Sequence, residues 1–218
     1  STLDRSSAAS DVYKRQIFFW AAYEQAGASL TLFAAEQTDR TIFGWEMPAS
    51  WIQSFNPFFV VILAAIMPSV WGALNKRGME PASPTKQAIG LLLLSLGYLV
   101  ICFGVKDVQP GVKVSLIWLT GLYFIHTMGE IALSPIGLSM VNKLTPVRFA
   151  SLMMGIWYLS TSTANKFAGT LGGLYPEDGK VKTLLGFRIE TMFDFFMVFV
   201  IMSGVASLIL FLLSKKLQ

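Results

Sequence analysis

Charged residues are scarce in this chain. Only 14% of its 218 residues are Asp, Glu, Lys or Arg, whereas soluble domains carry roughly 25%. Hydrophobic residues make up 54% of the sequence, and its mean hydropathy is +0.57. A soluble domain of this length has too little interior to bury so large an apolar fraction. The scarcity of charge therefore indicates a protein that lies in a lipid bilayer.

Cysteine and histidine are rarer still, with one residue of each, Cys102 and His126. A single cysteine excludes a disulfide framework and a cysteine-based metal site. The sequence also lacks a nucleophile elbow and a phosphate-binding loop. We therefore expect neither an enzyme nor a metal site.

Basic residues outnumber acidic ones, 17 against 13, but they do not form one cluster. They stand in short segments between apolar runs, which is typical of membrane loops and not of a face that binds nucleic acid. We expect no nucleic-acid partner. In the alternating loops, Lys and Arg are slightly more numerous on the side of both chain ends, which predicts cytoplasmic ends. The predicted location is the cell membrane (inner or plasma membrane), as a multi-pass protein.

Six apolar runs are long enough to cross a bilayer, which takes roughly 20 mostly apolar residues in a helix. The gaps between them hold proline, glycine or charged residues. The pattern predicts an all-α membrane protein with six transmembrane helices, at residues 17–35, 47–75 (the helix beginning near Ser50), 87–105, 114–142, 149–174 and 195–214.

The first residues of the chain differ from the rest. Residues 1–16 are polar and precede an abrupt change to apolar sequence. We interpret them as a foreign, artefactual or disordered leader. Residues 17–218 leave no room for a soluble domain and form one predicted six-helix membrane bundle.

Three residues of the Asp, Glu, Lys and Arg types fall inside the predicted spans, namely Glu24, Glu130 and Lys166. An ionisable group in a span is costly, so each is a functional hypothesis by default. Two interpretations of the carboxylates stay open. They either pair with a lysine and serve helix packing, or they load and release a proton during a transport cycle. Since Lys166 is the only strong cation in these runs, we expect their partners in chain outside this sequence.

A polar stripe follows the fourth run, because His126, Glu130 and Ser134 are spaced four residues apart and share a helix face. Pro135 comes next and is expected to kink the helix. For His126 we favour a packing role over a proton relay.

Other spans carry weaker signals. Asn56 precedes Pro57, which is expected to loosen the backbone, and it either joins helices or binds a ligand. In the fifth run, Trp157 and Thr161 share a face with Ala168 and with either Ala164 or Asn165. Gly169 and Gly173 form a G-x-x-x-G spacing that permits close helix contact.

Four segments together resemble the second-half helices of the proton-dependent oligopeptide transporter (POT) family, part of the major facilitator superfamily. The resemblance covers about residues 17–213, and its most specific part is the G-E-x-x-L-S-P-x-G-L-S run at 129–139. The segments are FFWAAYEQAG at 18–27, WIQSFNPFF at 51–59, HTMGEIALSPIGLSMVNKLTPVRF at 126–149 and MMGIWYLSTSTANKFAG at 153–169.

The resemblance implies roles for seven residues. Glu24, one turn after Trp20, corresponds to a carboxylate of proton coupling, and Glu130 is a second candidate proton carrier. Asn56 and Glu130 correspond to residues that hold the amino terminus of a peptide. The implied substrate-binding residues are Trp20, Asn56, Glu130, Trp157, Tyr158 and Thr161. In place of Tyr158 and Thr161 the family often has phenylalanine and serine.

The implied function is symport of di- or tripeptides with protons, the proton being the coupling ion and no other cofactor being expected. The chain would be the C-terminal half of a twelve-helix transporter, with its six helices in a 3+3 inverted repeat. Its partners would be the peptide, the lipid bilayer and a missing N-terminal six-helix half, without which we expect no transport. Two alternatives stay open: a non-peptide solute, and a six-helix membrane scaffold that transports nothing.

Overall fold

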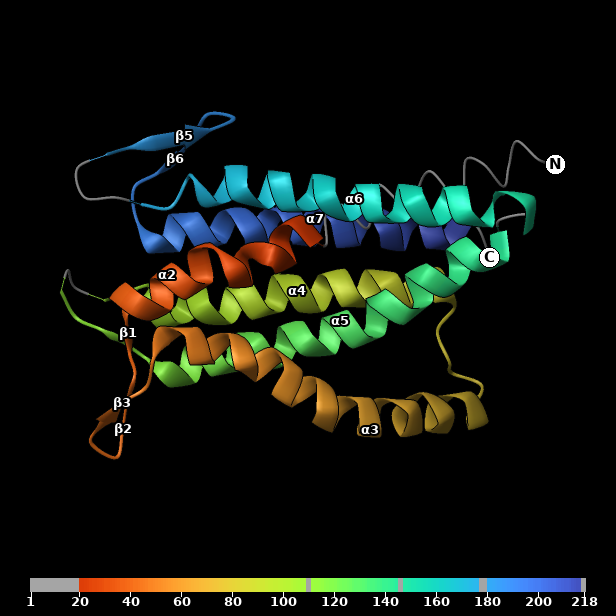
Figure 1. The fold of residues 1–218 in the computed structure, drawn as a ribbon, viewed down its shortest axis with the longest axis horizontal. Helices are drawn as coiled ribbons and strands as arrows, with labels where there is room; N and C mark the ends of the chain where they lie inside the picture. Colours follow the sequence, from red (N-terminus) through yellow and green to blue (C-terminus); the bar gives the residue numbers. More distant parts are fainter. Residues whose placement is uncertain (1–19, 109–110, 145–146, 177–179, 217–218) are drawn as a thin grey trace.

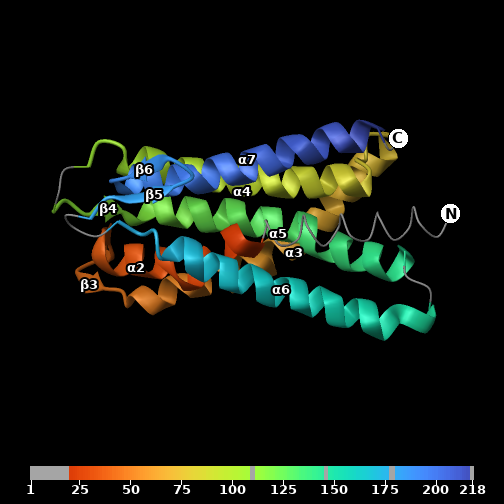
Figure 2. The same cartoon turned by 90° about the horizontal axis from the view of Figure 1, so that it is seen from above.

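The computed structural model describes residues 20–108, 111–144, 147–176 and 180–216, and its long helices run back and forth along one axis (Figures 1 and 2). Each of the last five predicted runs coincides largely with a helix of 22 residues or more, about 33 Å or longer at 1.5 Å per residue. The helical elements are η1 (Glu24–Gly27), α2 (Ser29–Glu36), η2 (Ala49–Ser54), α3 (Phe55–Lys76), α4 (Ser83–Val105), α5 (Leu116–Leu144), η3 (Val147–Phe149), α6 (Ala150–Gly172) and α7 (Met192–Lys216).

Four helices of the described chain are both long and apolar enough to cross a membrane, which makes this a multi-pass membrane protein. Helix α6 is long enough, but its Ser, Thr, Asn and Lys side chains make it more polar than these four helices. Six spans and the inverted repeat therefore stay predictions, and residues 1–16 lie outside the described residues. The four spans are Ala49–Lys76, Thr85–Val105, Leu116–Leu133 and Met192–Leu212.

Helices α4, α5 and α7 form the packed centre of the bundle and lie side by side in Figure 2. Gly90 of α4 and Gly129 of α5 face each other so closely that a Cβ on either would come within 3.0 Å of the other's carbonyl oxygen. Ser95 and Ser207 donate hydrogen bonds of 2.8 Å across the α4–α7 contact to backbone carbonyls. Small residues and side-chain hydrogen bonds are the usual means of joining helices in lipid.

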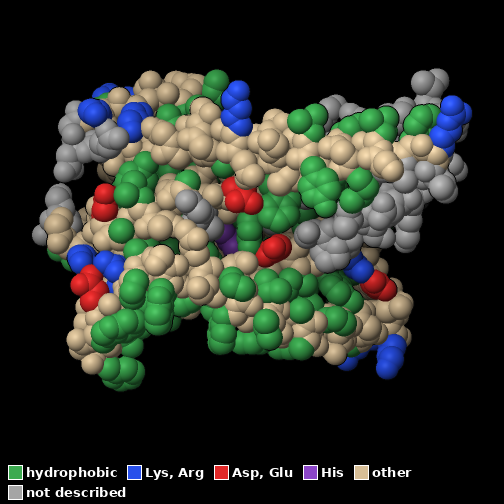
Figure 3. Space-filling model, in the orientation of Figure 1, with side chains coloured by type: hydrophobic (Ala, Val, Ile, Leu, Met, Phe, Trp, Pro, Cys, Tyr) green, Lys and Arg blue, Asp and Glu red, His purple; other side chains and the backbone are tan. Residues whose placement is uncertain are grey.

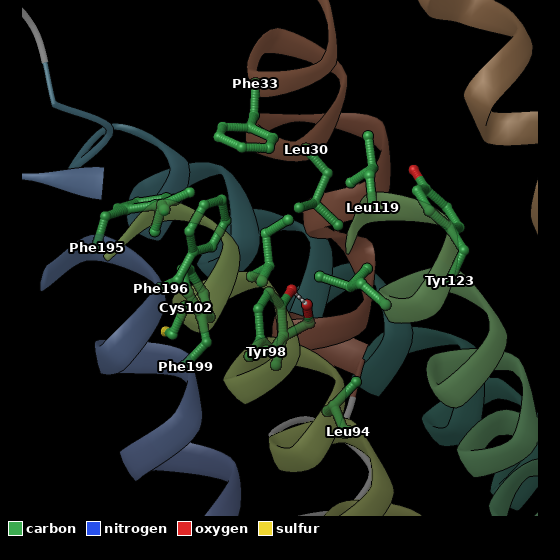
Figure 4. Packing of buried hydrophobic residues seen from close by; sticks show 14 of the residues in the cluster. Leu30, Phe33, Leu94, Tyr98, Cys102, Leu119, Tyr123, Phe195, Phe196 and Phe199 are labelled. Carbon is green, nitrogen blue, oxygen red and sulfur yellow. Dashed lines mark hydrogen bonds between the residues drawn. The ribbon is translucent and has the colours of Figure 1, made fainter. Parts of the chain in front are cut away.

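Aromatic side chains fill the space between these helices and α2. Phe196 and Phe199 of α7 stack on Tyr98 of α4, and Phe195 packs edge-on against both phenylalanines (Figure 4). Phe33 of α2 packs edge-on against Phe196. All five are nearly or fully buried. This cluster holds the end of the first hydrophobic segment against the centre.

Helix α3 lies apart from the others over much of its length (Figure 1) and packs mainly on α5 and η2. Leu63 is its one fully buried residue. Pro57 lies in the first turn of α3, just after the chain changes from the 3-10 helix η2 to α-helix, and whether it loosens the backbone stays a prediction. The proline inside the helix is Pro68.

The G-x-x-x-G spacing of α6 does not mark a close helix contact. A Cβ on Gly169 would meet nothing within 4 Å, and one on Gly173 would meet only carbonyls of its own turn. Close approach happens instead at Gly90 and Gly129, which lie on different helices and leave no spacing pattern in the sequence.

The described chain also has short strands, all at one end of the bundle (Figure 1), and the hydrophobic pattern predicted none of them. One pair is parallel and two are antiparallel hairpins. The pairs are β1 (Thr38–Asp39) with β4 (Val114–Ser115), β2 (Thr41–Ile42) with β3 (Trp45–Glu46), and β5 (Lys182–Leu184) with β6 (Phe187–Ile189).

Candidate functional site

The first hydrophobic segment is broken at Glu24. Residues 20–23 are α-helical, the chain then tightens into the 3-10 turn η1, and α2 begins at Ser29. A single helix over 17–35 was expected, so this is a correction for the described part. Broken helices occur at membrane depth where they are buried in protein or line a cavity. The break therefore marks the neighbourhood of Glu24 as a candidate site.

Gln25 fastens this break to α6. Its Nε2 donates to the carbonyl oxygen of Ala168 at 2.9 Å and to that of Ala21 at 3.3 Å. Its Oε1 accepts a hydrogen bond of 2.5 Å from Ser29. The Gln25 side chain is fully buried, and these bonds satisfy both its amide nitrogen and its carbonyl oxygen.

A polar cluster joins three elements next to the break. The hydroxyl of Tyr23 donates to Glu130 Oε2 at 2.6 Å. Asn56 Nδ2 reaches the same oxygen at 2.9 Å and Thr127 Oγ1 at 3.2 Å, and it also donates to the Tyr23 hydroxyl. Two donors from different helices thus converge on one half-buried carboxylate oxygen.

Glu24 directly follows Tyr23 in the chain and is half-buried. Its carboxylate is near enough to that of Glu130 for the two negative charges to repel each other. Within the described ranges neither carboxylate forms an ion pair, and Lys166 is exposed. The packing interpretation, in which a lysine neutralises each acid, is therefore not realised among the described residues.

The cluster lies toward a recess of the molecular surface. Figure 3 shows acidic side chains in a hollow between α6 and α3, with hydrophobic side chains around it. Trp20 borders the cluster, since its ring meets that of Tyr23 edge-on with centroids 5.3 Å apart. The hollow presents negative charge within largely apolar surroundings.

His126 contributes to packing, as favoured from the sequence. It is buried, its Nε2 lies 3.1 Å from the carbonyl oxygen of Leu94, and its ring packs edge-on against Tyr98 with centroids 4.7 Å apart. Gly97 makes room for it, because a Cβ there would lie 2.3 Å from the imidazole. His126 therefore faces α4, and Thr127 takes the position beside Asn56.

The predicted residues of α6 stand apart from this cluster. Trp157 is buried, Thr161 is half-buried and bonded back to the carbonyl oxygen of Trp157 at 3.3 Å, and Tyr158 is 67% exposed. Among the described residues no hydrogen bond joins Tyr158 or Thr161 to Glu130. The structure thus brings Trp20, Glu24, Asn56 and Glu130 together. Tyr158 and Thr161 of α6 do not join the hydrogen bonds of this cluster among the described residues.

Sequence reasoning missed Tyr23 and Thr127. Both had a positional signal: Tyr23 directly precedes Glu24, and Thr127 precedes Glu130 by three residues, which puts it on the same helix face. Tyrosine and threonine are common in membrane helices, and only the hydrogen bonds distinguish these two.

Comparison with known proteins agrees with the resemblance. The family model described as the POT family matches residues 8–184. The chain is 40% identical over 163 residues to the peptide transporter YePEPT of Yersinia enterocolitica, covering 74% of this chain and 32% of that protein. It is 30% identical over 202 residues to dipeptide and tripeptide permease A of Escherichia coli, covering 93% of this chain and 40% of the permease.

Solved structures give the same picture. A crystal structure of a peptide transporter POT in complex with sulfate matches with a TM-score of 0.85 and 30% identity, covering 99% of this chain and 41% of the other. A POT family transporter in complex with 5-aminolevulinic acid matches with a TM-score of 0.81 and 28% identity, covering 97% and 41%. The chain thus spans about a third to two fifths of the length of these relatives.

Proposed function

Since this chain belongs to the POT family of transporters, we propose that it forms the C-terminal half of a proton-coupled peptide symporter. The observation that carries the proposal is the convergence of Tyr23 and Asn56 on Glu130 beside a broken helix. The relatives named as peptide transporters support peptide as the substrate class.

The Glu130 cluster suits an ammonium group. A cation that leaves water needs an opposite charge and hydrogen-bond acceptors. Glu130 supplies the charge, its carboxylate oxygens and the Tyr23 hydroxyl oxygen are acceptors, and Asn56 Nδ2 donates to both groups and holds them in place. In this proposal the amino terminus of a di- or tripeptide binds here, and Trp157, Tyr158 and Thr161 of α6 border its side chains.

Glu24 suits proton coupling. It lies at the helix break, it is half-buried, and it faces the charge of Glu130 with no ion pair in the described chain. Protonation of Glu24 removes the repulsion between the two carboxylates, while an ammonium on Glu130 offsets the charge that causes it. Proton and substrate then favour the same arrangement, which is the condition for coupling two sites.

One observation favours a different substrate. A POT family relative of 28% identity was solved with 5-aminolevulinic acid, whose name denotes an amino group and an acid without a peptide bond. The Glu130 cluster addresses only the amino group. A small amino acid derivative is therefore the second candidate substrate.

Competition binding in vesicles tests the proposal, using this chain together with its proposed first half. Glu130→Gln should weaken binding of a free dipeptide by about tenfold or more, because hydrogen bonds to charged groups contribute about 1.5–3 kcal/mol. Binding of the same dipeptide with an acetylated amino group should change little. Glu190→Gln, in the exposed pair with Arg188, is the control. Equal losses for free and acetylated peptides would remove the ammonium contact.

A further inference from the structure

The two β-hairpins share a sequence pattern. Residues 41–46 read T-I-F-G-W-E and residues 183–188 read T-L-L-G-F-R. Each has threonine, two apolar residues, glycine, an aromatic residue and a charged residue in the same order. In both hairpins the second and fifth residues of this pattern pair with each other, so the third and fourth residues form the turn. The same local structure therefore occurs twice at one end of the bundle.

The turns contain a conformation that their residues disfavour. Phe43 and Leu185 have φ of 50° and 51°, and the glycines that follow have φ of 83° and 87°. Two-residue hairpin turns of this kind favour Asn, Asp or Gly first, because a bulky side chain at positive φ is strained. A large apolar residue at this position is unfavourable in both hairpins.

No contact within the described chain offsets that strain. The exposed fractions of Phe43 and Leu185 are 106% and 103%, the largest of any exposed apolar side chains there. Backbone strain persists where something else stabilises it, and it clusters at functional segments. The stabilising contact for these two side chains must come from outside the described chain.

The hairpins lie where the membrane spans begin. Strand β3 ends at Glu46, shortly before the span that starts at Ala49, and β6 ends at Ile189, shortly before the span that starts at Met192. In Figure 1 the two hairpins lie on opposite sides of the bundle, at the same end. A bilayer surrounds a bundle on all sides, whereas one partner protein would have to reach both sides at once.

The residues around the tips match the membrane surface. Trp45 and Trp51 are exposed and their rings lie 5.4 Å apart. Behind the tips, Glu46 pairs with Arg40 at 2.8 Å, and an equivalent pair of 2.9 Å joins residues 188 and 190. Aromatic rings flanked by charges are typical of the headgroup region.

We propose that β2–β3 and β5–β6 are membrane-surface anchors, with the side chains of Phe43 and Leu185 inserted into the headgroup region of the bilayer. The partner is the lipid surface itself. The role is independent of the transported substrate, and it fixes the depth of the bundle in the membrane at two separate points.

Spin-label accessibility of the chain in vesicles of phosphatidylethanolamine and phosphatidylglycerol tests this. Nitroxides go on Thr41→Cys and Thr183→Cys, which are exposed strand positions that leave the tips intact, and on Asp107→Cys in an exposed loop at the same end as the control. The unsubstituted chain is the control for background labelling, because its one cysteine, Cys102, is buried and should not take up the spin label. Collisions with oxygen report lipid, and collisions with a water-soluble nickel chelate report water.

The ratio of oxygen to nickel collisions should be several-fold higher at residues 41 and 183 than at 107. Adding Phe43→Asn or Leu185→Asn, which suits the turn but removes the apolar tip, should lower the ratio in that hairpin to the level of the control. Water-like ratios with intact tips would overturn the proposal. Low collision with both reagents would also overturn it, since it would show that protein covers the tips. A ratio that survives the Asn substitutions would exclude insertion by the tip side chains.

Discussion

The two sides of the helical bundle are held together by different kinds of contact. On one side α4, α5 and α7 pack closely, with glycine against glycine and a buried aromatic cluster. On the other side polar bonds supplement apolar packing. Gln25 binds the backbone of α6, and Asn56 of α3 binds Glu130 beside the aromatic contacts of Phe55 and Phe59 with α5. Close packing has one favourable arrangement, whereas a few hydrogen bonds exchange readily. The candidate site lies where the two sides meet, with Glu130 on close-packed α5 and Tyr23 and Asn56 on the polar side.

The largest expected effect is on the polar side. Glu24→Gln removes the group proposed to take up the proton, so proton-driven accumulation should be lost in the chain joined to its proposed first half. Peptide exchange without a proton gradient should persist. Uptake by vesicles with and without an imposed pH gradient measures both. Glu36→Gln, exposed at the end of α2, should retain both activities, and accumulation by Glu24→Gln would shift the role to Glu130.

A glycine substitution should separate the two sides by stability. In Gly129→Ala the new Cβ would lie 2.8 Å from the carbonyl oxygen of Gly90, and backbone atoms cannot move aside without parting α4 from α5. We expect a loss of about 3 kcal/mol in the free energy of unfolding, at the upper end for overpacking. Unfolding in mixed micelles by added SDS measures it.

Gly155→Ala in α6 is the matched control, since its Cβ would meet nothing within 4 Å. There the substitution should be neutral or stabilise by up to about 1 kcal/mol through helix propensity. Equal losses at both positions would contradict the distinction between the two sides.

Two tyrosines provide a finer comparison. Tyr23→Phe removes the hydrogen bond to Glu130 and should cost about 1.5 kcal/mol, as expected for a bond to a charged group. Tyr123 is buried, and its hydroxyl has no hydrogen-bond partner within the described ranges. Tyr123→Phe should therefore be neutral or stabilising. Unfolding by SDS measures the loss in both variants. A larger loss in Tyr123→Phe than in Tyr23→Phe would contradict the assigned hydrogen bonds.

The smallest effect should come from the hydrogen bonds between packed helices. Ser207→Ala removes the bond to the carbonyl oxygen of Ala88 and should cost about 0.6 kcal/mol, the average for such bonds in membrane proteins. Thr163→Ala in α6 removes a bond within one exposed helix turn and should have less effect. A loss above that of Gly129→Ala would show that polar groups contribute more than close packing to the contacts of α4 with its neighbours.

Helix positions were predictable because long apolar runs have few alternatives in lipid. The start near Ser50 and the ends of α4 and α5 came within a few residues. The break at Glu24 was not predictable, since it depends on Gln25 meeting α6, a contact far away in the sequence. Of the candidate site, Glu24, Glu130 and Asn56 stood out as polar groups in apolar runs, whereas Tyr23 and Thr127 did not.

The hairpins were missed for another reason. Their strands are too short to show the alternation that signals a β-strand, and their turns carry Phe43 and Leu185 where the usual signal is Asn-Gly or Asp-Gly. In α6, Trp157, Tyr158 and Thr161 were assigned to substrate binding only through the family resemblance.

Gln25 has a mechanical consequence. Because its amide donates a hydrogen bond to the carbonyl oxygen of Ala168, the Gln25 side chain joins η1 to α6. A displacement of α6 that keeps this bond moves the backbone next to Glu24 with it. Thr161 lies about two turns before Ala168 on α6. A substrate that displaced α6 at Thr161 would therefore move the Glu24 carboxylate without touching it.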